Sequence, residues 1–248
     1  MEKAGAQNPQ YIRNPNITEV KEVLDAAEKT VKVVALAPEK ANAIQVIEEL
    51  KNRGIVASAA HTNASYHEML LAIEAGLSHV THVFNAMRDF NGQEIGAVGA
   101  ALLHEELTTE LIADGVHVHP AAIKMLVKMK GYDKVVLISD AISATGLPDG
   151  RYELGGLEIL VNNGISTLPS GVLAGSTLTL DRAVKNMIEL ANVPVSEALK
   201  MATLNPARVL RLRTKGEIKE GADADIAILD RNFNVQSVMI HGKPLSFS

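Results

Sequence analysis

Four polar residues stand just after runs of apolar, β-forming residues in this sequence: His61, His82, His117 and Asp140. The stretches between these runs have the spacing of amphipathic helices, and alternating strands and helices predict a parallel sheet. Functional groups collect at the carboxyl ends of such strands, because these ends meet at one edge of the sheet. Imidazole and carboxylate groups in that place are typical of a metal-assisted hydrolase.

His61 and His82 are predicted to be the metal ligands. Imidazole suits zinc or ferrous iron, and two histidines with one or two carboxylates leave a coordination position open for water. His79 lies three positions before His82, so on an extended strand it points to the opposite face and packs toward the helices. The alternative for either ligand is an ordinary hydrogen-bonded histidine at a strand end. Their matching positions at the ends of successive strands favour metal binding.

Asp140 is predicted to be the general base. It follows Val136 and Ile138 on one strand face, and a carboxylate at the end of an apolar strand needs a partner that offsets its desolvation. A metal-bound water is such a partner, and its deprotonation is a task for a carboxylate. The alternative is that Asp140 caps the segment that follows, since a turn begins there.

Further segments could bind a substrate. His117 could orient a carbonyl or an anionic group, whereas His119 stands beside Pro120 at an expected helix start. Backbone amides at Asn85 and Ala86, just past His82, could hold an anion, and so could the glycine turn at 173–176, although a bare glycine turn is weak evidence.

The composition excludes several classes of protein. The 248 residues are 47% hydrophobic, enough for one large α/β domain with a small appendage. A net charge of −5 and 3% aromatic residues argue against a nucleic-acid partner, and the absence of cysteine excludes disulfides and thiolate ligands. No stretch reaches the ~18 apolar residues of a membrane span, and the first nine residues lack the apolar core of a signal peptide. A cytoplasmic protein with no membrane partner is expected.

Five strand-plus-helix units are expected, with strands beginning near residues 31, 55, 79, 108 and 134. The third strand is expected over 79–84, residues 87–99 are predicted to be an irregular loop near the site, and residues 151–173 an inserted hairpin. Helices are expected over 18–29, 38–52, 66–75, 120–130, 176–191 and 196–210, and a β-rich tail after 215. A closed barrel needs eight strands, so five units fit either an open sheet or a barrel whose beginning is absent.

Taken together, the site segments resemble the N-acetylglucosamine-6-phosphate deacetylases of the amidohydrolase superfamily. The likeness rests on His-Thr-Asn-Ala at 61–64, Thr-His-Val-Phe-Asn-Ala-Met at 81–87, Ile-Ala-Asp-Gly-Val-His at 112–117 and Ser-Asp-Ala at 139–141. Residues 5–9, 173–176, 201–207 and 221–225 match as well. The resemblance therefore covers essentially the whole chain, in order.

The resemblance implies an α/β fold, with a TIM-like (β/α) barrel over residues 1–214 and the remnant of a small β-sandwich over 215–248, in a homodimer. It implies that His61 and His82 bind a divalent metal, zinc or iron, and that Asp140 passes a proton from water to the leaving amine. The substrate would be an amino-sugar phosphate, with acetate and glucosamine 6-phosphate as the products. The positions that match substrate contacts are Ala6, Gln7, Asn85, Ala86, His117, Leu173, Ala174 and Gly175.

The chain departs from the family pattern in two places. Members carry a metal-binding glutamate in a Glu-Gly-Pro motif shortly before the segment that matches residues 5–9, and this chain starts after that point. A fragment lacking the first three barrel strands is therefore expected. Many relatives have the sequence Arg-Glu-Pro-Gly in the loop after the second histidine, and its arginine contacts the sugar phosphate. This chain has Gln93 in place of that arginine, and Arg88 is the candidate substitute for the phosphate contact.

Two other functions compete with this reading. One is an amidohydrolase that acts on a different N-acetyl amino sugar or on a cyclic amide, which a substrate panel would separate. The other is a non-catalytic truncated chain that persists by association through exposed sheet edges and apolar surface. Concentration-dependent assembly without acetate release would indicate the second.

Overall fold

The structure, a computed structural model, describes residues 2–245. It consists of two compact units. The first unit is built from Met1–Leu111 and Asp140–Thr177, and the second from Ile112–Ser139 and Leu178–Ser248. The chain therefore passes from one unit to the other at 111–112, 139–140 and 177–178.

Five parallel strands follow one another in a single sheet, as the sequence predicts. Their order is β1 (Val33–Leu36), β2 (Val56–Ala59), β3 (Leu77–Val80), β4 (Thr108–Ile112) and β5 (Val135–Ile138). The pairing sets Val33 opposite Val56 and His79 opposite Thr108. All four residues of β2 are buried, as expected for a strand covered on both faces.

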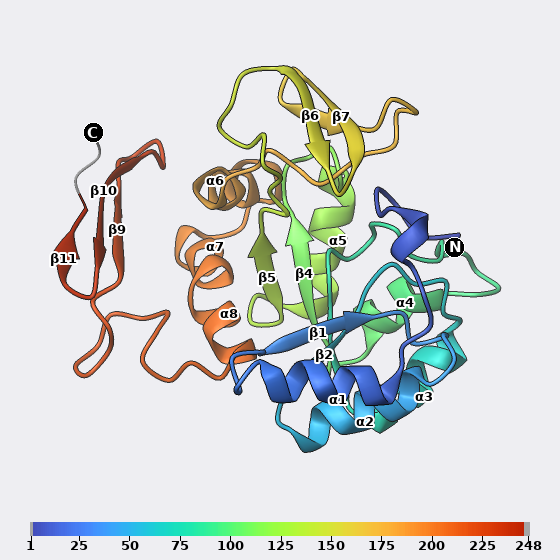
Figure 1. The fold of residues 1–248 in the computed structure, drawn as a ribbon. Helices are drawn as coiled ribbons and strands as arrows, with labels where there is room; N and C mark the ends of the chain where they lie inside the picture. The colour runs from blue at the N-terminus through green and yellow to red at the C-terminus, as the bar shows by residue number, and fades with distance from the viewer. Residues whose placement is uncertain (1, 246–248) are drawn as a thin grey trace. The chain divides into compact units, whose positions relative to one another are not determined.

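The helices of the first unit are α1 (Ile17–Ala26), α2 (Ala43–Asn52), α3 (Tyr66–Ala75) and α4 (Gly96–Leu103), after a short 3₁₀ turn at Pro9–Tyr11. Figure 1 shows α1, α2 and α3 lying along one side of β1 and β2. The α3 helix begins where the sequence predicts, since Ser65 and Glu68 form a capping box.

Three expectations need correction at element boundaries. The predicted loop 87–99 ends at Gly96, because α4 begins there, and the helix expected from Pro38 begins at Ala43. The strand expected over 79–84 ends at Val80, since the chain turns over residues 81–86. One predicted helix over 196–210 is two, α7 (Val195–Ala202) and α8 (Leu204–Val209), separated by the non-helical Thr203.

The insertion after Asp140 is a three-stranded antiparallel sheet rather than a simple hairpin. Its strands are β6 (Gly150–Leu154), β7 (Leu157–Asn162) and β8 (Ile165–Thr167). Its small core is formed by buried side chains of the insertion, against which Ala6 packs: Ala144, Ile159, Val161 and Ala174. The segment around Ala6 is thereby anchored to the insertion.

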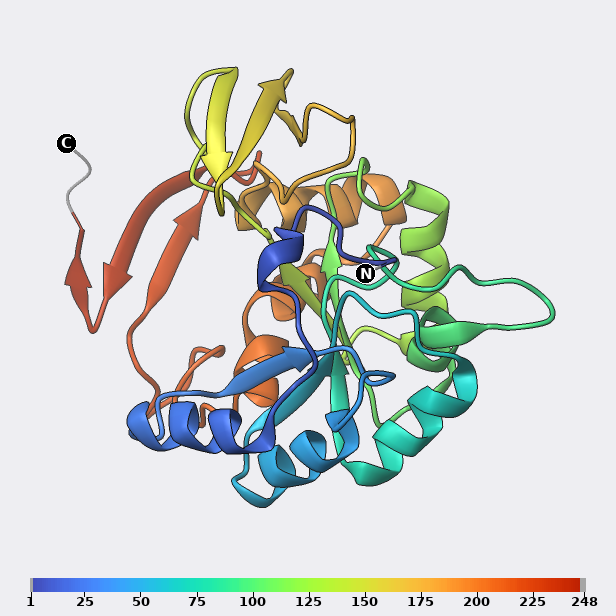
Figure 2. The ribbon, with the colours of Figure 1, turned by 45° about the vertical axis from the view of Figure 1, so that its right-hand side comes forward.

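In the second unit, α6 (Leu180–Ala191), α7 and α8 contact β5, and α5 (Pro120–Lys130) contacts α6. Asn205 of α8 is buried and donates to the carbonyl oxygens of Tyr132 and Val135 at 2.8 and 2.7 Å. The tail forms an antiparallel sheet of β9 (Ile226–Leu229), β10 (Val235–Ile240) and β11 (Lys243–Pro244), which Figure 2 shows as a twisted ribbon. Over residues 2–245, no helix has the length and apolarity needed to cross a membrane.

Candidate active site

His61 and His82 lie side by side, as the sequence predicts. Each stands two residues after the last residue of its strand, β2 or β3. Their Nε2 atoms are 3.1 Å apart, and their rings meet edge-on with centroids 4.8 Å apart. Two imidazole nitrogens are thus directed at nearly the same point in space.

The backbone at this site is unusual. His61, His82 and Asp140, which stands two residues after β5, have φ angles of 45°, 31° and 50°. Left-handed backbone costs a residue with a Cβ roughly 1–2 kcal/mol, so it persists only where the surroundings enforce it. The three predicted site residues thus share a left-handed conformation just after their strands, which Phe84 and Ala86 in the turn after β3 also adopt.

His61 is held from its other nitrogen by the N-terminal segment. Its Nδ1 lies 3.0 Å from the carbonyl oxygen of Lys3, so Nδ1–H donates and Nε2 keeps the lone pair that faces His82. Burial lowers the pKa of His61, and the neighbouring His82 lowers it further. Gly5 (φ +57°) allows this approach, because a Cβ there would lie 3.1 Å from His61 Cε1. The neutral, oriented imidazole is the form that binds a metal ion.

The loops that follow the two histidines are hydrogen-bonded to each other. The N–H of Arg88 donates to the carbonyl oxygen of Thr62 at 2.9 Å, and Thr62 forms an isolated parallel bridge with Met87. The pairing of β2 with β3 therefore resumes beyond the histidines and fixes the distance between them.

His79 has a different role, as predicted. Its ring is buried, with Nδ1 2.6 Å from Thr108 Oγ1 and Nε2 2.9 Å from Glu110 Oε1. The strand alternation used to separate His79 from His82 does not extend to His82, which lies in the turn. The conclusion holds because both ring nitrogens of His79 are engaged elsewhere.

Asp140 is exposed to the cavity, so the desolvation argument made from the sequence does not apply to it. Its charge raises the pKa of His61, so the carboxylate acts on that imidazole electrostatically. The carbonyl oxygen of Asp140 accepts from the Ser176 N–H at 2.7 Å, and no helix begins after it before Leu180. The helix-capping alternative therefore has no support.

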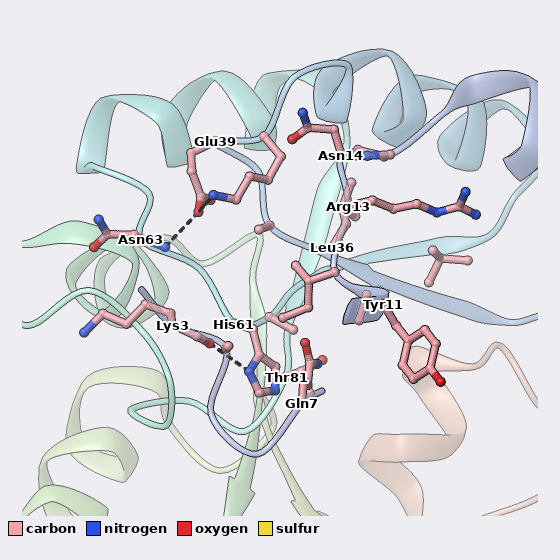
Figure 3. Close-up of a pocket in the computed structure, with 18 of the residues that line it drawn as sticks. Lys3, Gln7, Tyr11, Arg13, Asn14, Leu36, Glu39, His61, Asn63 and Thr81 are labelled. Atoms are coloured by element: carbon pink, nitrogen blue, oxygen red, sulfur yellow. Dashed lines mark hydrogen bonds and ion pairs between the residues drawn. The ribbon is translucent and has the colours of Figure 1, made fainter. Parts of the chain in front are cut away.

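A cavity of about 1430 Å³ brings these groups together within the first unit. His61, His82 and Asp140 line it, and so do the predicted substrate contacts Ala6 and Gln7. Figure 3 shows Gln7 and Thr81 close to His61, with Lys3 and Asn63 on the other side. The lining also contains Arg88, the candidate phosphate contact, and three polar residues that the sequence did not single out: Lys3, Glu39 and Asn63.

Other predicted substrate contacts lie outside this lining. Asn85 and Ala86 form the turn after His82, where the Asn85 side chain donates to the carbonyl oxygens of His82 and Val83. The 173–175 segment pairs with β8: Leu173 bridges Thr167, and buried Ala174 exchanges hydrogen bonds with Ser166. A Cβ on Gly175 would lie 3.0 Å from the Asp140 carbonyl oxygen, so this residue packs behind Asp140.

His117 belongs to the second unit, where Asp114 orients it. Asp114 Oδ2 lies 2.6 Å from His117 Nδ1, and Oδ1 accepts from the N–H groups of Val116 and His117. Burial raises the pKa of Asp114, but the hydrogen bonds from His117 outweigh burial and hold that pKa below its ordinary range. The ring of His117 thus presents Nε2.

The two converging imidazoles fit a metal ion. Two nitrogens bound to tetrahedral zinc at about 2.0–2.1 Å are roughly 3.3 Å apart, close to the observed 3.1 Å. The buried Nδ1 of His82, on the opposite side of the ring from the Nε2 that meets His61, has no hydrogen-bond partner among the described residues. Over residues 2–245, no group of three or more His, Cys, Asp or Glu side chains is placed to hold a metal ion.

The sequence profile of the amidohydrolase family matches residues 6–245. The chain belongs to the amidohydrolase family. Within it, the chain is 37% identical to the N-acetylglucosamine-6-phosphate deacetylase of Lysinibacillus sphaericus over 98% of its own length and 62% of the relative's. It is 41% identical to the N-acetylgalactosamine-6-phosphate deacetylase of Escherichia coli O157:H7 over 98% of its length and 64% of the relative's.

A solved structure of this amidohydrolase type matches the fold closely. It is the N-acetyl-D-glucosamine-6-phosphate deacetylase of Mycobacterium smegmatis, an aspartate-to-alanine mutant in complex with N-acetyl-D-glucosamine-6-phosphate. The TM-score is 0.94 at 38% identity, over 98% of this chain and 65% of that one. The chain thus spans less than two thirds of the length of these relatives.

Proposed function

We propose that this protein is a metal-dependent hydrolase that removes the acetyl group from N-acetylglucosamine 6-phosphate, giving acetate and glucosamine 6-phosphate. The observation that carries the proposal is the convergence of the His61 and His82 Nε2 atoms, 3.1 Å apart, in a cavity that Asp140 also lines. The family and the names of the relatives supply the substrate class. The finer fold proposal is a (β/α) barrel with a β-sandwich remnant.

His61 and His82 would hold a divalent ion, zinc or iron, through Nε2. When bound, such an ion supplies a Lewis acid that acidifies water and polarises a carbonyl. The Lys3 carbonyl keeps the proton of His61 on Nδ1, so that Nε2 carries the lone pair that faces His82.

Asp140 would carry the proton. Its exposed carboxylate accepts a proton from the attacking water as the new C–O bond forms at the acetamide carbon. It then delivers that proton to the nitrogen as the C–N bond breaks, so that the amine leaves neutral. General base and acid catalysis of this kind contributes roughly 10²–10⁴-fold.

The predicted substrate contacts complete the proposal. Ala6 and Gln7 line the cavity beside His61, where they can contact the sugar. Asn85, Ala86, His117 and the 173–175 segment stay predictions, as do the homodimer and the cytoplasmic location. Arg88 lines the cavity and is the proposed phosphate contact.

Acetate release from N-acetylglucosamine 6-phosphate tests the proposal. We expect turnover by the metal-loaded chain and a loss of about 10²–10⁴-fold in kcat for Asp140→Asn. Asp133→Asn, which changes an exposed aspartate away from the site, should leave kcat unchanged. Absence of turnover in a chain that elemental analysis shows to be metal-loaded would refute the proposal.

The substrate panel should also contain unphosphorylated N-acetylglucosamine and the C4 epimer, N-acetylgalactosamine 6-phosphate. The epimer is included because one relative, 41% identical, is named for it. A kcat/KM that is higher for the epimer would reassign the sugar but keep the reaction.

A further inference from the structure

Glu39 is a carboxylate at the site that accepts hydrogen bonds from the first two residues after His61. It follows β1 by three residues and lines the same cavity. Its Oε2 accepts from Thr62 Oγ1 at 2.6 Å, and its Oε1 accepts from the Asn63 N–H at 2.9 Å. Figure 3 shows Glu39 reaching Asn63 from the chain that leaves β1.

The two residues that Glu39 holds come directly after His61. Thr62 is fully buried, and its Oγ1 also accepts from the Ala64 N–H at 2.9 Å. Glu39 therefore binds the start of this loop through one side chain and one backbone group. Both contacts bridge elements more than twenty residues apart, so they restrain the loop against the sheet and not only against itself.

The loop after His61 is held from both sides. On the β3 side, the Arg88 N–H donates to the Thr62 carbonyl oxygen. On the β1 side, the Glu39 carboxylate accepts the hydrogen bond from the Thr62 hydroxyl. The left-handed φ of His61 is unfavourable by itself, so these restraints must enforce it. Without Glu39, the loop loses its hydrogen bonds on the β1 side, and the orientation of the imidazole toward His82 loses that support.

The carboxylate itself is committed to this bracing. Its side chain is 12% exposed, and among the described residues its ion-pair partner is Lys40, 3.6 Å away with a side chain that is 36% exposed. The two short hydrogen bonds from Thr62 and Asn63 are thus the main compensation for burying the charge. Charge-assisted bonds of this kind are stronger than neutral ones, which suits a brace against backbone strain.

We infer that Glu39 is a positioning residue, which fixes the loop after His61 so that the imidazole faces His82 and can bind the metal. The inference rests on the metal site of the proposed function. Partners beyond the direct ligands typically change metal affinity by about 10- to 100-fold when they are removed. A loss in that range is therefore expected for Glu39→Ala.

Cobalt(II) titration of the full chain, followed by the visible absorption of the bound ion, tests the inference. Glu39→Ala should raise the cobalt Kd by about 10- to 100-fold. Glu39→Gln should stay near the wild type, because its amide oxygen still accepts from Asn63 and its amide nitrogen can donate to Thr62 Oγ1. The matched control is Glu68→Ala, which removes another cavity-lining carboxylate that bonds Ser65 in the capping box.

The outcomes separate positioning from general destabilisation. The inference would be overturned if Glu39→Ala and the wild type had equal cobalt Kd values. It would also be overturned if Glu39→Ala and Glu68→Ala lost cobalt affinity equally at matched unfolding temperatures. ¹H–¹⁵N spectra of the metal-free imidazoles give a second readout: the His61 Nδ1–H signal should persist in Glu39→Gln and broaden in Glu39→Ala. If the wild type bound no cobalt, the proposed metal site would fail, and an unchanged signal in Glu39→Ala would overturn the positioning role separately.

Discussion

Replacing Gly5 by alanine tests whether the N-terminal segment is part of the metal site. Gly5 has φ +57°, and an alanine Cβ there would lie 3.1 Å from His61 Cε1 and 3.4 Å from Nδ1. The left-handed backbone costs alanine about 1–2 kcal/mol. An ordinary van der Waals contact between this Cβ and the His61 ring is a few tenths of an ångström longer, so either the imidazole or the N-terminal segment must move by that amount.

The cheapest response is for the segment to lift from His61. That movement breaks the hydrogen bond between the Lys3 carbonyl oxygen and His61 Nδ1, which is worth about 0.5–1.5 kcal/mol. If metal binding requires the segment to return to His61, the steric strain at the introduced alanine and the cost of the displaced Lys3–His61 hydrogen bond both reduce the metal affinity. Since 1.4 kcal/mol is tenfold in affinity, the cobalt Kd of Gly5→Ala should rise by about tenfold or more.

The control separates backbone strain from contact with His61. Gly171 is also left-handed, at φ +86°, but a Cβ there meets no atom within 4 Å. Gly171→Ala should therefore lower the unfolding temperature by a similar amount while leaving the cobalt Kd unchanged. A Gly5→Ala variant that binds cobalt as tightly as the wild type would refute the claim that this segment orients His61.

Three further predictions concern stability and substrate affinity. Asn205→Ala should lower the free energy of unfolding by about 2–4 kcal/mol, measured by urea titration, because the buried Val135 carbonyl oxygen and a second, partly buried carbonyl oxygen lose their donor. Asp114→Asn should destabilise the protein above about pH 4, and the difference from the wild type should vanish in acid. The reason is that the pKa of Asp114 is lower in the native state than in the unfolded state. Its contribution to stability is therefore present above the unfolded-state pKa and is lost as the pH falls through the native pKa. Melting curves between pH 2 and pH 7 would contradict this if the gap stayed constant. Arg88→Ala should raise KM for the phosphorylated sugar and leave that for the unphosphorylated sugar unchanged; equal KM values for both proteins on both sugars would remove Arg88 from phosphate recognition.

Much of the fold follows from local patterns. The α3 helix was predictable because Ser65 and Glu68 supply both halves of a capping box, and α5 because it runs from Pro120 to a glycine at its C-terminus. The α4 helix was not, because its sequence, Gly-Ala-Val-Gly-Ala-Ala-Leu-Leu, is apolar on nearly every face and carries no 3.6-residue period.

The site was predictable in its residue types but not in its restraints. Strand ends located His61, His82 and Asp140, since the sheet brings its carboxyl ends to one edge. The left-handed turns that orient these side chains have no signature in the local sequence. The hydrogen bonds accepted by Lys3 and Glu39 join residues 58 and 23 positions apart, so they leave no local signal either. The only hint for Glu39 was a carboxylate just after a strand, at the edge where the histidines lie.

The left-handed conformation of His61, His82 and Asp140 sets stability against function at three positions. Glycine adopts this backbone without penalty, and asparagine does so more readily than most residues, so either would relieve local strain at each position. Directed evolution that selects only for heat resistance should therefore enrich glycine or asparagine at these positions while discarding the proposed chemistry. Engineering of a thermostable variant should hold these residues fixed and seek its gains elsewhere in the chain.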